Sequence, residues 1–469
     1  MLSEQNEQYD VAIIGGGPAG YVAGIRAQQL GAKVAVIEKE YWGGVCLNVG
    51  CIPTKAMVST VEVLKMANMG AALGLRGSVE VDYAAFFARK EKVVNQLVSG
   101  VEGLLKANGA ARIFGAARLR RPGEVEVLGA DGEQTIRAKN ILLATGSVPA
   151  KPPIPGLDLP NVVDSTGLLA LKEQPKELVI IGGGYIGIEF GNIFTNIGTK
   201  VMVIEMLPRI LMQTDEELAK RLTQMLKKDG IDFHFDSQVL GVEEHEGKLA
   251  VRYAEKGGEE KLATGDTVLY ATSRWPYTEG LGLEEAGIEM NGRAIKVNAQ
   301  MQTNLPGVYA AGDVIGGIML AHVAWEESKV AVSNMLGKCA KMEYLAVPSC
   351  VFSTPELASV GLTEAEAKDQ GYETKIGRFP FSASGRAIGM GEPVGMVKMI
   401  SEAGSGEILG THILGPHASD LIAESVIAME MGATAEDLDL TIHAHPTLPE
   451  AVQEAALGTT GKMIHYIGR

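Results

Sequence analysis

The feature that most constrains the fold is a motif that occurs twice in the chain. An apolar segment runs into glycines in VAIIGGGPAG at 11–20, and the pattern is repeated in LVIIGGGYIG at 178–187. Each copy is followed by a second apolar segment that ends in an acid, and both parts are offset by the same interval (182 − 15 = 167 and 205 − 38 = 167). A strand, a glycine turn, a helix and a second strand make a βαβ unit. The chain is therefore predicted to contain two βαβ units of one kind.

The glycines in these units indicate dinucleotide binding. The first permits a tight turn, the second lets the backbone approach a pyrophosphate, and the third allows close packing of helix on strand. The acid that ends the second strand can accept hydrogen bonds from an adenosine ribose. A single copy could use its glycines for packing alone, but two copies with equivalent acids favour two nucleotide sites. Their residues are Gly15, Gly17, Gly20 and Glu38, then Gly182, Gly184, Gly187 and Glu205.

The second acid also predicts which nicotinamide cofactor is used. A carboxylate at Glu205 would repel the 2′-phosphate of NADP, which is usually held by arginines. The following segment, MLPRILMQ, contains only Arg209. The second site is therefore expected to prefer NAD.

Composition limits the compartment and the partners. The 469-residue chain is long enough for several domains, and its net charge of −15 argues against nucleic acid or an anionic membrane as a partner. Its four cysteines are too few for a secreted disulfide scaffold, which indicates a cytoplasmic setting. The polar, acidic N-terminus indicates no targeting signal, and no apolar run approaches the length of a membrane span. The sequence indicates no metal site.

Two of the cysteines lie five residues apart in GGVCLNVGCIPTK, at positions 46 and 51. Five steps along an ideal helix separate two Cα atoms by about 8.7 Å, whereas a disulfide needs about 4.4–6.8 Å. A bond between them requires a distorted turn, which Gly50 and Pro53 favour. Two buried free thiols are the alternative. Because the pair follows the first glycine turn by some 25 residues, a redox disulfide beside the first dinucleotide is the prediction.

The C-terminal segment HAHPTLPE at 443–450 offers a base for thiol chemistry. A thiol attacks a disulfide as its thiolate, yet a free thiol is mostly protonated at neutral pH. His445 has the right intrinsic pKa range for a base, and Glu450 could orient its ring, as carboxylates do in hydrolytic triads. Pro446 and Pro449 predict a fixed loop between the two residues. His443 is a competing candidate.

In order along the chain, these motifs resemble those of the dihydrolipoyl dehydrogenases, within the pyridine nucleotide disulfide oxidoreductase family. The resemblance also includes ATG at 144–146, AAGD at 310–313 and MLAH at 319–322. It implies an α/β fold with two Rossmann-like domains, a central segment and a C-terminal α+β dimerisation domain. The expected borders are 1–149 for the FAD-binding domain, 150–275 for the NAD-binding domain, 276–346 for the central segment and 347–469 for the interface domain. Strands at GMVKMI and EILGTHIL and a helix from Ser419 to Met431 are expected in the last domain.

The resemblance assigns further residues to the two cofactors. Beside the first glycines and Glu38, it implies that FAD is held by Gly115, Thr145, Gly146, Gly312, Asp313 and Ala321. Lys55 would lie near the flavin and pair with Glu189. Beside the second glycines and Glu205, it implies that NAD is held by Val239 and Arg274. His322, in MLAH, is expected to pack near the flavin.

The activity implied is oxidation of protein-bound dihydrolipoamide through Cys46 and Cys51, with His445 contributed by the second subunit of a homodimer. The implied partner is a lipoyl-bearing acyltransferase of a 2-oxoacid dehydrogenase complex or the lipoyl carrier protein of glycine cleavage. The alternatives are a glutathione or mercuric reductase, and a flavoprotein that only docks. The chain departs from the family pattern at Val45, where Thr is usual, and at Ser273, Trp275 and Tyr277 in a segment resembling ATGRxPN.

Overall fold

The computed structural model describes residues 8–130 and 132–467. Residues 1–7, part of the N-terminus in which no targeting signal is expected, lie outside this description. The described residues form two compact units, each containing one glycine repeat. Of the described residues, the first unit draws on 8–56, 87–130, 132–150 and 273–343, and the second on 57–86, 151–272 and 344–467. The four domain borders stay predictions.

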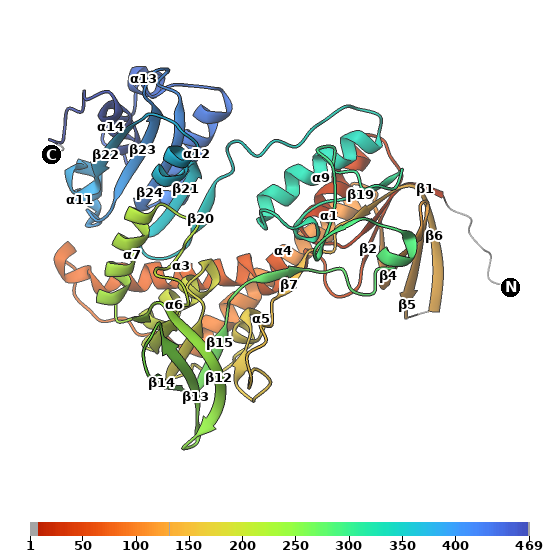
Figure 1. Ribbon diagram of the computed structural model, residues 1–469, viewed down its shortest axis with the longest axis horizontal. Coiled ribbons are helices and arrows are strands. Elements are labelled where there is room, and N and C mark those ends of the chain that lie inside the picture. The colour runs from red at the N-terminus through yellow and green to blue at the C-terminus, as the bar shows by residue number, and fades with distance from the viewer. Residues whose placement is uncertain (1–7, 131, 468–469) are drawn as a thin grey trace. The chain divides into compact units, whose positions relative to one another are not determined.

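The first unit is built on a mainly parallel sheet with the strand order β3-β2-β1-β6-β5-β4 (Figure 1). Parallel pairs join β2 (Val34–Glu38) to β1 (Gln8–Ile14) and β1 to β6 (Gly132–Leu143). Strand β19 (Val308–Ala310), from the expected central segment, adds to β6 in parallel. The remaining strands of this unit are β3 (Ala111–Phe114), β4 (Ala116–Arg121), β5 (Glu124–Gly129), β7 (Ser147–Pro149), β16 (Arg274–Pro276), β17 (Met290–Asn291) and β18 (Ala294–Ile295).

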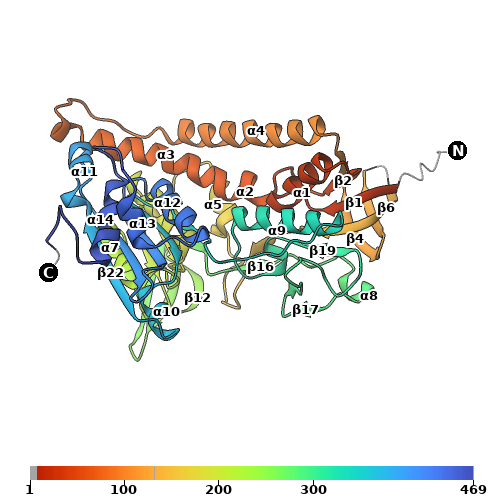
Figure 2. The ribbon, with the colours of Figure 1, turned by 90° about the horizontal axis from the view of Figure 1, so that it is seen from above.

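Two helices lie side by side in this unit, α1 (Pro18–Gln29) and α9 (Ala321–Met335) (Figure 2). Small residues let α1 pack closely, since Ala19, Ala23 and Ala27 are all buried in one core with the first sheet. The short helix α8 (Leu283–Ala286) and the 3₁₀ turn η2 (Asp313–Ile315) complete the unit. The central segment therefore supplies both a strand and a helix to the first nucleotide domain.

The second unit repeats the βαβ pattern. Its parallel sheet has the order β11-β10-β9-β15-β8, and α6 (Tyr185–Asn196) follows β9 as α1 follows β1, offset at both ends by the same interval (185 − 18 = 167 and 196 − 29 = 167). A three-stranded antiparallel sheet is added to it (Figure 1). The elements are β8 (Val162–Val163), α5 (Ser165–Leu169), β9 (Glu177–Ile181), β10 (Lys200–Ile204), α7 (Glu216–Lys228), β11 (Asp232–His234), β12 (Ser237–His245), β13 (Lys248–Glu255), β14 (Glu260–Gly265) and β15 (Thr267–Tyr270).

The C-terminal part of this unit is the expected α+β layer. An antiparallel sheet of order β20-β21-β24-β23-β22 packs against α12 (Ala418–Glu430) and α14 (Glu450–Thr459). The strands predicted at GMVKMI and EILGTHIL are β23 (Met396–Glu402) and β24 (Ile408–Gly415), and the predicted helix is α12, so these expectations are confirmed. The other elements are β20 (Ser349–Val351), β21 (Glu356–Gly361), α10 (Glu364–Asp369), β22 (Thr374–Pro380), η3 (Phe381–Ala383), α11 (Gly385–Met390) and α13 (Ala435–Leu440).

The helices around the cysteine pair correct one expectation. The stretch Gly44–Asn68 is long and apolar enough to cross a membrane by length and composition, although no apolar run of that length was predicted. It consists of two helices, α2 (Gly44–Val49) and α3 (Cys51–Asn68), which break at Gly50. Side chains such as Leu47 and Val61 lie in the cores of the two units, so we interpret the stretch as core helices. Further along, η1 (Gly70–Leu73) and α4 (Tyr83–Ala107) follow.

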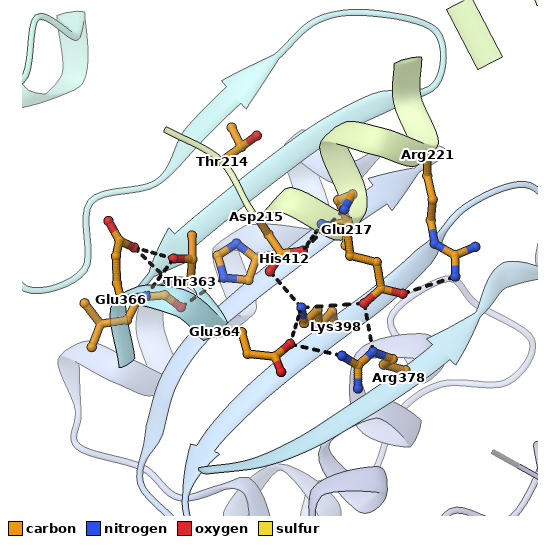
Figure 3. A network of polar contacts seen from close by, with 12 residues as sticks. Thr214, Asp215, Glu217, Arg221, Thr363, Glu364, Glu366, Arg378, Lys398 and His412 are labelled. Carbon is orange, nitrogen blue, oxygen red and sulfur yellow. Dashed lines mark hydrogen bonds and ion pairs between the residues drawn. The ribbon is translucent and has the colours of Figure 1, made fainter. Parts of the chain in front are cut away.

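An ion network centred on a buried lysine joins the second nucleotide-binding part to the C-terminal sheet (Figure 3). Lys398, on β23, is 2 % exposed, and its ammonium lies 2.8 Å from Asp215 Oδ2 and 2.7 Å from Glu364 Oε2. Asp215 also caps α7 by accepting from the amides of the first turn. Arg378, on β22, completes the network by donating to Glu217 and Glu364. The network fixes the start of α7 to two strands of the C-terminal sheet, β22 and β23.

Candidate active site

Cys46 and Cys51 form a disulfide across the break between α2 and α3. Their Cα atoms are 4.7 Å apart, which is possible because Gly50 leaves the helical path with φ −147° and ψ −112°. The amide and hydroxyl of Thr54 both donate to the Gly50 carbonyl, which anchors the first turn of α3. The predicted disulfide and the distorted turn are confirmed, and two free thiols are excluded at these positions.

The start of α2 lies directly against the first glycine turn. The Gly43 amide donates to the Gly16 carbonyl at 2.9 Å. A Cβ added at Gly44 would lie 2.6 Å from the Gly17 Cα, so only glycine permits this approach. The sulfur pair therefore stands beside the first nucleotide-binding turn, as its sequence position predicted.

The first glycine turn fits a dinucleotide pyrophosphate. Gly15 has φ +110°, and a Cβ there would lie 2.2 Å from the Ala144 carbonyl oxygen. Gly20 approaches the turn closely enough that a Cβ would lie 1.8 Å from the Gly15 oxygen. At Gly17 the nearest heavy atom to an added Cβ is 3.7 Å away, so no protein atom occupies the side-chain position there. The three glycines thus have the separate roles that the motif predicts.

The carboxylate of Glu38 is held ready for a ribose. One oxygen accepts the Gly16 amide at 2.6 Å, and the other accepts the Lys39 and Glu40 amides, each at 2.8 Å. A carboxylate has about four lone-pair sites, so capacity remains for ribose hydroxyls. The backbone orients Glu38 before any ligand binds.

The other residues assigned to FAD lie at the ends of neighbouring strands. Thr145 and Gly146 follow β6, and Asp313 begins η2 after β19. The hydroxyl of Ser147 donates to Asp313 Oδ2 at 2.5 Å, and the Gly312 amide donates to the buried Glu327 at 2.7 Å. Sequence reasoning missed Ser147 and Glu327. The remaining assigned residues are Gly115, whose amide donates to the Glu38 carbonyl at 2.8 Å, and Ala321, which begins α9.

The second glycine turn has the same construction. Gly182 has φ +112° with a Cβ position 2.6 Å from the Ala271 oxygen, and a Cβ at Gly187 would lie 2.1 Å from the Gly182 oxygen. A Cβ at Gly184 would meet nothing within 4 Å. Glu205 accepts the Gly183 amide at 2.5 Å and the Leu207 amide at 2.8 Å. The repeat seen in the sequence is therefore a repeat of hydrogen bonds as well.

Two assignments to the NAD site are separated between the units. Val239 is on β12 of the second unit. Arg274 belongs to the first unit, where its Nε donates to the Ser147 hydroxyl and its Nη2 to the Ser147 carbonyl, both at 2.8 Å. Its contact with NAD stays a prediction. The pairing of Lys55 with Glu189 also stays a prediction, because the two residues belong to different units. Within its own unit, Glu189 accepts the Phe352 amide at 3.0 Å.

His445 and Glu450 form the predicted pair. His445 Nδ1 lies 2.8 Å from Glu450 Oε1, and the imidazole side chain is 80 % exposed. Burial alone would raise the pKa of Glu450, but the Thr447 amide and His445 outweigh it and lower that pKa. Glu450 is therefore an ionised orienter, and it leaves the other ring nitrogen of His445 facing outward as an acceptor.

His443 is held by partners of its own. Its Nε2 lies 2.6 Å from Glu424 Oε1, its Nδ1 lies 2.8 Å from the Thr441 carbonyl, and its side chain is 6 % exposed. Both ring nitrogens are thus engaged, which favours His445 as the base. Glu424, which sequence reasoning missed, anchors the loop from α12. A cavity of about 460 Å³ lies beside this loop, lined by Glu424, Arg386 and residues 446–449.

Comparison with known proteins decides the family. The model named "Pyridine nucleotide-disulphide oxidoreductase" matches residues 9–328, and the dimerisation domain of the same family matches 347–456. The chain belongs to this family. FAD and NAD are the cofactors of this enzyme, and the two glycine turns are the candidate sites for them.

Named relatives within this family are similar over nearly the whole chain. Dihydrolipoyl dehydrogenase of Bacillus subtilis is 44 % identical over 98 % of this chain and 98 % of its own. The enzyme of the same name from Thermus scotoductus is 44 % identical over 98 % and 99 %. Among solved structures, the HOCl-induced flavoprotein disulfide reductase RclA of Escherichia coli is 31 % identical with a TM-score of 0.86, covering 96 % of this chain and 99 % of that one. Both the sequence and the fold are those of a flavoprotein disulfide reductase.

Proposed function

We propose that this protein is a dihydrolipoyl dehydrogenase. It oxidises the two thiols of protein-bound dihydrolipoamide to the lipoamide disulfide and reduces NAD⁺ to NADH, releasing a proton. The observation that carries the proposal is the Cys46–Cys51 disulfide set against the first glycine turn, in a chain 44 % identical to enzymes of that name.

The sulfur step uses His445 and the two cysteines. The free ring nitrogen of His445 takes the proton of one substrate thiol, and Glu450 stabilises the imidazolium that results. The thiolate attacks Cys46, which breaks the Cys46–Cys51 bond and leaves Cys51 as a thiolate. The second substrate thiol then attacks the mixed disulfide, and its proton passes to the Cys46 thiolate that is displaced. This step releases lipoamide and leaves both cysteines reduced.

The two glycine turns hold the cofactors between which the electrons pass. FAD fits the first turn with Glu38, and when bound it carries the electron pair from the reduced cysteines to NAD⁺. NAD would be held at the second turn, where Glu205 would accept a hydrogen bond from a ribose hydroxyl and disfavour a 2′-phosphate. The protein supplies position and charge at both turns.

A homodimer supports this arrangement. The dimerisation domain of the family spans 347–456 and includes both His445 and Glu450. The same region exposes large apolar side chains, among them Met431 at 80 % and Ile442 at 96 %, which a second copy of the chain would cover. The exposed His445 is then free to face a disulfide of the partner subunit.

The lipoyl group is proposed to arrive on another protein. An acyltransferase of a 2-oxoacid dehydrogenase complex and the lipoyl carrier of glycine cleavage carry the same arm, so either suits the site. The net charge of −15 supports a basic docking partner, and the few cysteines support a cytoplasmic setting.

Steady-state assays with alternative substrates test the proposal. Dihydrolipoamide with NAD⁺ is expected to give the highest kcat/KM, while glutathione disulfide or Hg(II) with NADH or NADPH gives little turnover. Faster turnover of glutathione disulfide or Hg(II) would reassign the protein to another reductase. Absence of turnover with every pair would support a docking flavoprotein instead.

A further inference from the structure

Tyr277 is fixed by its backbone to the turn that follows β6. Its amide donates to the Gly146 carbonyl at 2.9 Å, and its carbonyl accepts the Thr145 hydroxyl at 2.7 Å. The residues around it continue the ribbon between β16 and β7, in which Pro276 faces Ser147. The backbone position of Tyr277 is therefore set by the ATG turn at 144–146.

The ring of Tyr277 contacts the segment that follows β2. The ammonium of Lys39 lies 3.9 Å from the ring centroid, well within the reach of a cation–π contact, which extends to about 6 Å. Lys39 is the residue after Glu38, and its amide donates to Glu38 Oε1 at 2.8 Å. One side chain thus connects the ATG turn to the segment that orients the ribose-binding acid.

The strand order shows where the Lys39–Tyr277 contact lies relative to the first glycine turn. In the first sheet β1 lies between β2 and β6, so the glycine turn after β1 lies between the segment after β2 and the turn after β6. Ligands of parallel α/β sheets bind beyond the carboxyl ends of the strands. The contact between Lys39 and Tyr277 therefore links the two segments that flank the nucleotide-binding turn.

We propose that Tyr277 and Lys39 form a clasp that retains FAD. Release of the adenosine half of the cofactor requires the segments after β2 and β6 to separate, and the clasp opposes that separation. Only an aromatic side chain offers the face that Lys39 contacts, so the clasp depends on Tyr277 itself. The proposal rests on the FAD site assigned to Glu38, Thr145 and Gly146.

The test compares the rate of FAD release from the holoenzymes of Tyr277→Asn, Tyr277→Phe and Lys39→Met. Release in dilute chaotrope is measured as the rise in fluorescence of free flavin. An exposed cation–π contact corresponds to about a two- to fivefold change in an equilibrium or rate. Tyr277→Asn and Lys39→Met are expected to release FAD about two- to fivefold faster, and Tyr277→Phe to release it at the wild-type rate. The double variant should be no faster than either single one, because both remove the same contact.

Two comparisons separate the possible failures. Wild-type release rates in Tyr277→Asn and Lys39→Met, or additive effects in the double variant, would overturn the clasp. Glu38→Ala tests the FAD site itself: if this change also leaves release unaffected, the site assignment fails. Melting of the apoproteins guards against general destabilisation, since loss of one exposed contact predicts only a small shift of the melting temperature, of similar size with and without FAD. A large drop in the apoprotein melting temperature would mean that faster release reflects a damaged fold and would overturn the clasp.

Discussion

Lys398 and Asp215, which come from the dimerisation sheet and from the start of α7, form a buried ion pair at 2.8 Å. Both side chains are at most 3 % exposed. Glu364 accepts a second hydrogen bond from the ammonium, and Asp215 accepts hydrogen bonds from backbone amides at the start of α7. The desolvation penalty of a buried charge is offset only while all these partners stay in place.

Lys398→Met is therefore expected to lower the free energy of unfolding by about 3–5 kcal/mol, because it leaves Asp215 buried without its cation. The urea midpoint of the holoenzyme measures the effect. Lys220→Met is the control, since Lys220 pairs with Glu216 on the exposed face of α7 and exposed pairs contribute little. Equal midpoints for the two variants would show that the network does not stabilise the fold.

Stability should fall on acidification in two stages. Burial lowers the pKa of His412, so the folded state resists its protonation and loses stability as the pH falls below 6.5. Burial would raise the pKa of Asp215, but its hydrogen bond with Lys398 and nearby positive charge lower that pKa below 3.8. Its contribution is complete above that value and is lost as the pH falls through the lowered folded-state pKa. Urea midpoints from pH 7 to pH 3 should show both stages in the wild type and a shallower second stage in Asp215→Asn. If the midpoints of the two proteins fell in parallel with pH, Asp215 would not cause the second stage.

His445→Gln should lower kcat with dihydrolipoamide by about 10²–10⁴-fold, the usual contribution of a general base. Glu450→Gln should cause a smaller loss, because it removes the orienting charge and leaves the base. His245→Gln, an exposed histidine at the end of β12, should keep wild-type turnover. Initial rates of NADH formation measure all three, and a His445 variant as active as the His245 control would remove His445 from the mechanism.

Substitutions of the two equivalent acids, Glu38 and Glu205, should each affect the binding of only one cofactor. Glu205→Ala is expected to raise the KM for NAD⁺, because the ribose loses a hydrogen-bond acceptor. It should also reduce the preference for NAD⁺ over NADP⁺, because no carboxylate remains to repel a 2′-phosphate. FAD content, read from absorbance, should be unchanged. Glu38→Ala should show the opposite pattern, with loss of FAD and little change in the KM for NAD⁺ of the flavin-loaded fraction. A lowered FAD content in the Glu205 variant would mean that the two turns are wrongly assigned.

Sequence reasoning predicted the features that depend on local geometry. Glycine positions, the acids and the Cys46–Cys51 spacing each limit the backbone within a few residues, and the structure has the turn, the carboxylate contacts and the disulfide where they were expected. The pairing of His445 with Glu450 was also local, five residues apart across a loop made stiff by prolines.

Contacts between distant segments were missed because no local pattern encodes them. Glu424 reaches His443 from another helix, and Ser147, on β7, contacts both Arg274 on β16 and Asp313 at the start of η2. One signal was available: a lysine inside the apolar strand GMVKMI must be buried and therefore needs buried carboxylates. Which carboxylates those are depends on how α7 packs on the sheet.

The central claim is that electrons enter through the Cys46–Cys51 disulfide. Alkylation of the anaerobic holoenzyme, before and after one equivalent of dihydrolipoamide without NAD⁺, tests it most directly, with peptide mass spectrometry to locate the label. Cys46 and Cys51 are expected to be unlabelled before reduction and to become alkylated after it. If both cysteines stay unlabelled while the same preparation reduces NAD⁺ with dihydrolipoamide, the electrons do not enter through this disulfide.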